Sequence, residues 1–169
     1  METLEAIKKR RSIRKFKNKE IPEDIIKKIL MAGMQAPSAG GAKTWHFIVV
    51  KDQNLKDQIP EFSPFAEMIK KAPLGILVCS DLNLEKYKGF WQQDCAAAIQ
   101  NMLLSATDLG LGAVWTGVYP MEGRPEGYKK LLNIPKNVMP VGFVVIGYPA
   151  EEPVKTINFM QDRVHENKW

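Results

Sequence analysis

A long apolar helix is the feature that most constrains how this 169-residue chain can fold. Residues 89–109 are apolar nearly all round, which is typical of a helix buried on every side. The apolar side chains are those of Phe90, Trp91, Ala96, Ala97, Ala98, Ile99, Met102, Leu103, Leu104 and Ala106. So short a chain has little else to cover such a helix. We therefore expect part of its cover to come from a second subunit, in a homodimer.

Helical and strand patterns alternate along the rest of the chain. Thr3 can cap a helix that ends near Arg11, and a second helix begins at Pro22 and presents Ile25, Ile26, Ile29 and Leu30 as a core face up to Gly33. Further helices are expected at 65–71 and 125–132, and strands at 47–50, 74–79, 113–116 and 141–146. With one more helix between the first two strands, to which no bounds are assigned, the order is helix, helix, strand, helix, helix, strand, helix, strand, helix, strand. This order predicts one α+β domain over residues 1–169, a mixed sheet flanked by helices.

Several classes of protein do not fit the sequence. No apolar run approaches the roughly 18 residues of a membrane span, and charges occupy the N-terminal positions where a secretory signal needs apolar residues. We expect a cytoplasmic protein without a membrane partner. Cys79 and Cys95 stand sixteen residues apart with no CxxC pair, and His46 and His165 are the only histidines. The cysteines are therefore expected to be reduced and structural, with no metal site.

The positive charge of the chain is concentrated at its N-terminus. Residues 1–19 hold eight of the 24 basic residues and two of the 19 acidic ones, so the remainder is close to neutral although the whole chain carries +5. If the chain is extended after the first helix, Arg10, Ser12 and Arg14 share one face while Ile13 anchors the other on the core. Two guanidinium groups and a hydroxyl suit a compact phosphate better than a long polyanion. Plain surface charge and nucleic-acid binding are the alternatives, and we expect no nucleic-acid partner.

Two loops offer backbone groups to a ligand. Residues 36–44 are rich in Gly, Pro and Ser and lead into a buried strand, so the loop at Pro37–Gly41, with Ser38 and Ala39, offers backbone amides without large side chains in the way. The strand at 113–116 ends in a loop, where the N–H groups around Thr116 and Gly117 could donate to a ligand. Each signal alone fits an ordinary turn. Neither GxGxxG after a strand nor a P-loop motif is present.

Catalytic side chains are hard to find in this sequence. Neither cysteine has a nucleophile setting, no GxSxG occurs, and Asp94 and Asp108 stand on a helix without a visible partner. His46, next to Trp45, is more typical of a packing histidine than of a base. A cofactor pocket without acid–base residues suggests that the cofactor supplies the chemistry.

Four stretches together resemble the FMN-dependent nitroreductase family, and the resemblance covers nearly the whole chain. They are residues 9–16 (KRRSIRKF), 36–47 (APSAGGAKTWHF), 94–104 with 109–117 (DCAAAIQNMLL and LGLGAVWTG) and 163–169 (RVHENKW). The resemblance implies an α+β fold in a domain-entwined homodimer. It also implies two equivalent flavin sites at the interface, each built from both subunits.

The family resemblance also assigns roles to residues. Arg10 and Ser12, with the adjacent Arg11, would hold the FMN phosphate, and Arg14 would lie toward the pyrimidine edge of the ring. Pro37, Ser38 and Ala39, in the same loop as Gly41, would come from the other subunit, and the backbone at Thr116 and Gly117 would donate to flavin N5 or O4. The basic residues Arg163 and Lys155 would complete the phosphate site. The cofactors implied are FMN and, as electron donor, NADH or NADPH.

The implied reaction is ping-pong hydride transfer from NAD(P)H through flavin N5 to a small oxidised acceptor such as a nitroaromatic or a quinone. No catalytic side chain is required. A flavin-binding, electron-storing protein without turnover is the alternative from another class, and a small basic nucleic-acid-binding protein is a second one.

Overall fold

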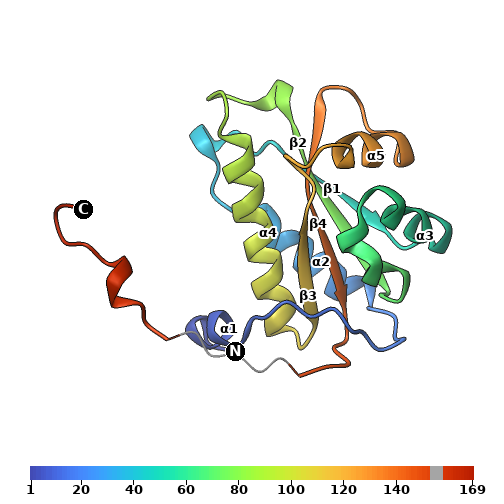
Figure 1. Ribbon diagram of the computed structural model, residues 1–169, viewed down its shortest axis with the longest axis horizontal. Helices are drawn as coiled ribbons and strands as arrows, with labels where there is room; N and C mark the ends of the chain where they lie inside the picture. Colours follow the sequence, from blue (N-terminus) through green and yellow to red (C-terminus); the bar gives the residue numbers. More distant parts are fainter. Residues whose placement is uncertain (153–157) are drawn as a thin grey trace.

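A twisted sheet with helices on both faces forms the body of the protein (Figure 1). The computed structural model describes residues 1–152 and 158–169. Its strands are β1 (Trp45–Val50), β2 (Leu74–Asp81), β3 (Gly112–Gly117) and β4 (Val138–Gly147). Its α-helices are α1 (Thr3–Lys9), α2 (Glu23–Met34), α3 (Gln53–Phe62), α4 (Trp91–Asp108) and α5 (Arg124–Leu131). Four 3₁₀ turns are described: η1 (Ala39–Gly41), η2 (Pro64–Lys70), η3 (Leu82–Leu84) and η4 (Gln161–Arg163).

The sheet has the order β1-β2-β4-β3, so β2 and β4 are its central strands. All three pairings of these strands are antiparallel, with Leu77 opposite Phe143 and Trp115 opposite Val144. Parallel pairing in the described residues is confined to an isolated bridge between Ser12 and Ala113. The α+β class is confirmed, and the mixed character of the sheet is limited to this bridge at its outer edge.

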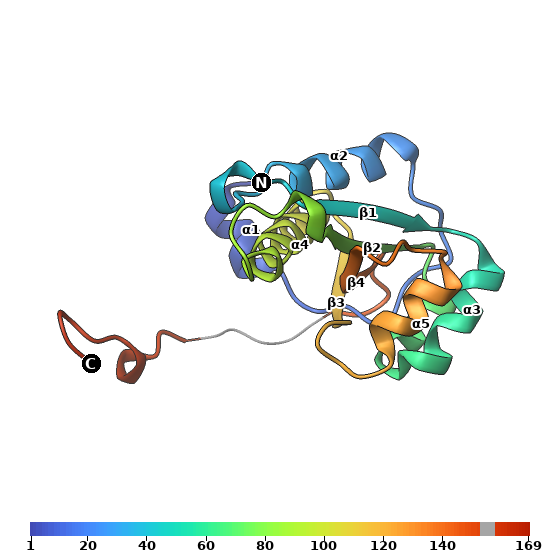
Figure 2. The same ribbon diagram turned by 90° about the horizontal axis from the view of Figure 1, so that it is seen from above.

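Each face of the sheet has its own apolar core. Helices α2 and α4 cover one face, and α3, η2 and α5 cover the other, as the view from above shows (Figure 2). The two central strands are buried on both faces because their side chains alternate between the two cores. In β2, for example, Ile76 and Val78 enter the first core, and Leu77 and Cys79 the second.

The observed elements differ from the expected ones mainly at their ends. Helix α2 matches the prediction closely, with Ile26 and Ile29 buried. Thr3 does not cap α1, since the N-cap is Glu2 and its side chain makes no capping bond. Residues 64–70 form a 3₁₀ turn instead of the expected α-helix, and a kink at Ala66 interrupts it. The four strands are two to four residues longer than the predicted runs because strand pairing extends beyond the apolar core of each run.

Helix α4 is buried on one side only within this chain. Eight of its residues are buried, and they face α2 and the sheet. Ala96, Ala97 and Leu104, on its other side, are half-buried. Part of the small-residue face thus stays uncovered in the single chain, as expected if a second subunit supplies the rest of the cover, and the homodimer itself stays a prediction.

The two cysteines are free thiols in the interior of the sheet–helix layer. Both are buried, and the Cys95 Sγ donates to the Cys79 carbonyl at 3.6 Å. Burial disfavours the thiolate and raises the pKa of both thiols to about 12.

This burial predicts that the native protein resists alkylation. Because the thiolate is the nucleophile and forms only near pH 12, the folded protein should take up no iodoacetamide at pH 8, whereas the urea-unfolded protein should take up two equivalents. Mass spectrometry counts the adducts. Rapid labelling of the folded protein would contradict the assignment of both thiols to the core.

The C-terminal tail (residues 158–169) lies outside this body. Figures 1 and 2 show it extending away from the sheet, and all its residues are exposed. It carries large apolar side chains, with Phe159 77% and Trp169 fully exposed. Its described hydrogen bonds are local to the tail.

None of the described helices has the length and apolar character needed to cross a membrane.

Candidate functional site

The basic N-terminal segment runs along the outer edge of β3. Ser12 forms the parallel bridge with Ala113, and the Ile13 N–H donates to the Ala113 carbonyl at 3.0 Å. The Ile13 side chain is buried against Gly112, whose lack of a Cβ makes this contact possible. Ile13 thus anchors the segment as predicted, and Ser12 stays exposed beside the strand.

The arginines of this segment differ in their surroundings. Arg10 follows the last turn of α1 and is half-buried, whereas Arg14 is exposed. The Arg11 guanidinium folds back onto the end of α1, where Nη1 donates to the carbonyls of Lys8 at 2.9 Å and Arg10 at 2.6 Å. Arg11 therefore binds carbonyls at the helix C-terminus, and the ligand roles of Arg10 and Arg14 stay predictions from the extended spacing.

Glu151 holds the backbone of the segment. Its Oε1 accepts the Arg14 N–H at 2.6 Å and the Lys15 N–H at 3.1 Å. These amides, the Arg14 N–H above all, hold the pKa of Glu151 below its usual range. The backbone around Arg14 is thus fixed by a carboxylate that comes from the far end of the chain.

The outer edge of β3 ends in an outward-directed amide. The Ala113 carbonyl is directed outward, to the Ile13 N–H. Because the backbone groups of successive residues alternate in direction along a strand, the N–H and C=O of Trp115 and Gly117 are directed outward too, and those of Thr116 toward β4. Thr116 is buried, and its hydroxyl also donates to the Phe143 carbonyl at 3.2 Å. Of the two expected amide donors, only that of Gly117 is therefore directed away from the sheet.

Arg124 fixes the exposed end of β3. Its side chain is 8% exposed, and Nη1 donates to the Gly117 carbonyl at 2.8 Å. Its guanidinium also lies 5.1 Å from the ring centre of Phe65. The neighbouring Trp115 indole lies across Gly142, where a Cβ would come within 2.3 Å of Nε1. The buried Arg124 thus holds the end of β3 in place.

Replacing Arg124 with methionine should destabilise the protein. The variant keeps the apolar stem but loses a charge-assisted hydrogen bond, so the free energy of unfolding should fall by about 1.5–3 kcal/mol. Urea denaturation measures this change. The control is Lys130→Met on the same helix, an exposed residue expected to change stability by less than about 0.5 kcal/mol. Equal stability of the two variants would show that Arg124 does not hold Gly117.

The glycine-rich loop is a rigid turn. Ser38 accepts the Lys43 N–H through Oγ at 2.9 Å, and the Ala39 N–H donates to Asp94 Oδ1 at 3.0 Å. Gly40 has a positive φ of 59°, and a Cβ there would come within 2.7 Å of the Tyr87 ring. Glycine is therefore required at this position on two grounds. Pro37 and Gly41 are exposed beside it.

The loop and the basic segment lie at opposite ends of α4. Asp94, in the first turn, binds the loop, whereas Asp108, at the last residue, pairs with the Met1 amino group at 2.8 Å and so fixes the start of α1. Fourteen residues of helix separate these contacts by about 21 Å. One chain therefore does not bring both sets of predicted residues together. The segment and Gly117, in contrast, share the β3 edge, about 13 Å apart.

The predicted C-terminal ligands lie elsewhere. Arg163 belongs to the exposed tail, away from the basic segment of its own chain (Figure 1). Lys155 lies outside the described residues.

Three residues with a clear role at this site were not predicted as such from the sequence. Asp94 and Glu151 act on backbone groups that are distant in sequence, and Arg124 acts on Gly117, seven residues before it. Asp94 gave a weak signal, a carboxylate in an otherwise apolar helix. No spacing pattern marks Arg124 or Glu151. Among the described residues no group of three or more His, Cys, Asp or Glu side chains could hold a metal ion.

Comparison with known proteins gives consistent matches. The model of the nitroreductase family matches residues 7–64 and 63–148. A protein of Methanothermobacter thermautotrophicus, named provisionally as an NADH dehydrogenase/NAD(P)H nitroreductase, is 53% identical over 100% of this chain and 88% of its own. A crystal structure of a protein with the same provisional name from Parabacteroides distasonis has a TM-score of 0.95 and 40% identity, covering 99% and 98% of the two chains. An FMN-dependent nitroreductase of Clostridium difficile has a TM-score of 0.91 and 31% identity, covering 98% and 99%.

Proposed function

This chain belongs to the nitroreductase family, and we propose that it is an FMN-dependent oxidoreductase that takes electrons from NADH or NADPH and passes them to a small oxidised acceptor. The names of its relatives support both cofactors. The acceptor class proposed is the nitroaromatics and quinones.

The outer edge of β3 is the observation that carries this proposal. Exposed Ser12 and the nearby residues Arg10 and Arg14 belong to the segment at one end, and the outward Gly117 N–H lies at the other. The cationic end suits a single phosphate, and the amide end suits a ring atom that accepts a hydrogen bond. The span of about 13 Å between Ser12 and Gly117 suits a mononucleotide.

We also propose that the protein works as a homodimer with two such sites. The loop at Pro37–Gly41 and the basic segment lie at opposite ends of α4, so a partner has to supply one of them if both contact the same flavin. The half-buried alanines of α4 and the exposed Phe159 and Trp169 of the tail leave apolar surface for this partner to cover. Arg163 would reach the phosphate site of the partner.

In this proposal the protein binds and orients, and its side chains transfer no proton. FMN, when bound, supplies a ring that accepts and then donates a hydride. Arg14 would stabilise negative charge at the pyrimidine edge of that ring, and Gly117 would fix the ring by its N–H. Because donor and acceptor would use the same open face, NAD(P)H has to leave before the acceptor binds, which gives ping-pong kinetics.

The visible spectrum of the purified protein tests this proposal first. We expect a yellow protein that releases FMN and not FAD, and a colourless protein that takes up no added FMN would contradict it. Anaerobic mixing with NADH and with NADPH then separates an enzyme from an electron-storing flavoprotein. The enzyme should bleach within its turnover time, whereas a storage protein should stay yellow with both donors.

A further inference from the structure

A pocket of about 740 Å³ lies at the end of the sheet where β1 stops and β2 begins. Its volume is within the range of small-molecule sites, roughly 300–1,000 Å³. The apolar residues at its floor, Ile21, Ile26 and Leu74, are buried, and most of its accessible lining is polar, with four lysines and two glutamates. The basic segment at Ser12 is three strand spacings away, roughly 14 Å, so this pocket is separate from the proposed flavin site.

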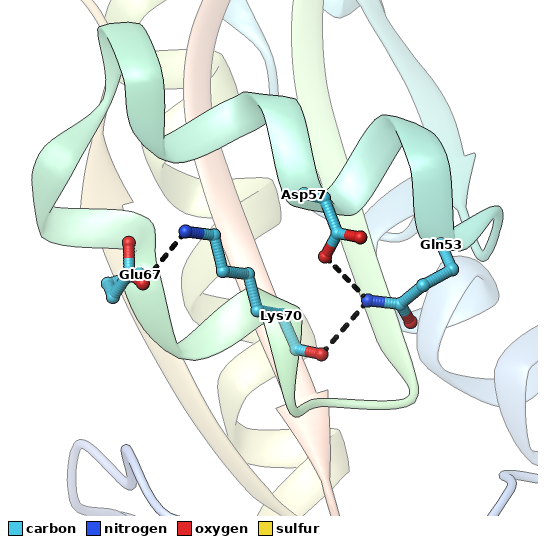
Figure 3. Close-up of polar contacts among 4 residues, drawn as sticks. All are labelled: Gln53, Asp57, Glu67 and Lys70. Atoms are coloured by element: carbon cyan, nitrogen blue, oxygen red, sulfur yellow. Dashed lines mark hydrogen bonds and ion pairs between the residues drawn. The ribbon is translucent and has the colours of Figure 1, made fainter.

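The rim of the pocket is a rigid structure. The Gln53 side-chain amide donates to Asp57 Oδ1 at 2.7 Å and to the Lys70 carbonyl at 3.1 Å, which ties the first turn of α3 to the end of η2 (Figure 3). The Lys70 ammonium turns to Glu67, at 2.9 Å. Lys51 forms an ion pair with Glu23. Of the four lysines that line the pocket, Lys51 and Lys70 are therefore already neutralised by protein carboxylates.

Lys56 is the unusual group in this pocket. It is 6% exposed, and its Nζ donates to the Ala72 carbonyl at 2.9 Å. Within the described part of the chain, no carboxylate comes within ion-pair distance of it. Burial lowers the pKa of Lys56, and Asp57 and Asp52 counteract this only in part. A buried ammonium without a counter-charge is costly, and an anion in the pocket would supply the missing charge.

We propose that this pocket binds a small organic anion, with its carboxylate or phosphate on Lys56 and its apolar body on the floor formed by Ile21, Ile26 and Leu74. The exposed Lys71, at the rim, adds a second positive charge to the entrance. This site is independent of the flavin and of the reaction proposed for it.

Three probes test the proposal on the FMN-loaded protein: 3-phenylpropionate, phenyl phosphate and the neutral 3-phenylpropionamide. Backbone amide shifts in NMR titrations should move at Gln53, Ala72 and Leu74. At least one of the two anions should bind about tenfold or more tightly than the amide, and the stronger of the two identifies the head group. Equal binding of all three, no saturation, or shifts at Ser12 and Gly117 instead would overturn the proposal.

Variants of Lys56 give the matched test. Lys56→Gln keeps a donor for the Ala72 carbonyl but removes the charge, so the preference for the anion should disappear, whereas Lys56→Arg should retain it. The control is Lys28→Gln on the exposed face of α2. FMN content and NADH oxidation should be unchanged in all three. An anion preference that survives in Lys56→Gln would overturn the assignment to Lys56. If that variant does not fold, the comparison of the anions with the neutral amide in the unaltered protein still decides whether the pocket prefers anions.

Discussion

Arg10→Ala is expected to lower the affinity for FMN by about tenfold to a hundredfold, because it removes a charge-assisted contact to the phosphate worth about 1.5–3 kcal/mol. Turnover at saturating FMN should change little, since the substitution is at the phosphate end of the β3 edge. Equilibrium titration of the apoprotein with FMN measures the change. Lys9→Ala is the control, because Lys9 is exposed and forms an ion pair with Glu5, four residues upstream on α1. An unchanged affinity of Arg10→Ala for FMN would show that Arg10 is an ordinary surface charge and does not bind the phosphate.

Arg14→Ala should give a different phenotype from the same extended segment. It removes positive charge beside the ring, so the midpoint potential should fall and hydride transfer should slow even with FMN fully bound. Riboflavin, which lacks the phosphate, provides the control for both variants. Its binding should be insensitive to Arg10→Ala and weakened by Arg14→Ala. Identical effects of the two substitutions would contradict the orientation proposed for the flavin.

Gly40→Val is expected to abolish FMN binding without unfolding the protein. A side chain there would have a positive φ of 59°, and its Cβ would come within 2.7 Å of Tyr87, so the loop at Pro37–Gly41 has to rearrange. Circular dichroism should show the native fold, and FMN retained after gel filtration should fall at least tenfold.

Gly110→Val is the matched control for this loop variant. It has a similar φ of 75° but nothing within 4 Å of the added Cβ, so it carries the backbone strain without the clash. It should retain FMN. Normal FMN content in Gly40→Val would show that the loop is not part of the flavin site.

Much of this fold was predictable because its signals are local. The apolar faces of α2 and of the buried strands follow from side-chain periodicity, and turn residues mark their ends. The bounds of α3 were not predicted: Asp52 caps it, but Pro60 interrupts its pattern within the last turn. The antiparallel order of the sheet could not be read from the sequence, because pairing depends on contacts between segments far apart in the chain.

The candidate site was predictable only in part for a related reason. The extended spacing of Arg10, Ser12 and Arg14 is local, and the structure places the segment as expected, with Ile13 buried. The inward direction of the Thr116 N–H depends on the register with β4, and the roles of Asp94 and Arg124 depend on tertiary contacts. No pattern in the sequence indicates the direction of this N–H or the roles of these two side chains.

A mixed dimer tests whether each flavin site is built from both subunits. Arg10→Ala and Gly40→Val chains, each with a different affinity tag, are co-expressed, and dimers that carry both tags are isolated. If each site takes its basic segment from one chain and its loop from the other, one site combines both defects and the other is intact. The account predicts about one FMN per mixed dimer and NADH oxidation at about half the rate of the unaltered dimer, although neither variant alone binds FMN well. Mixed dimers that bind no more FMN than the parent variants would contradict it, because a site contained within one chain would be defective in both subunits.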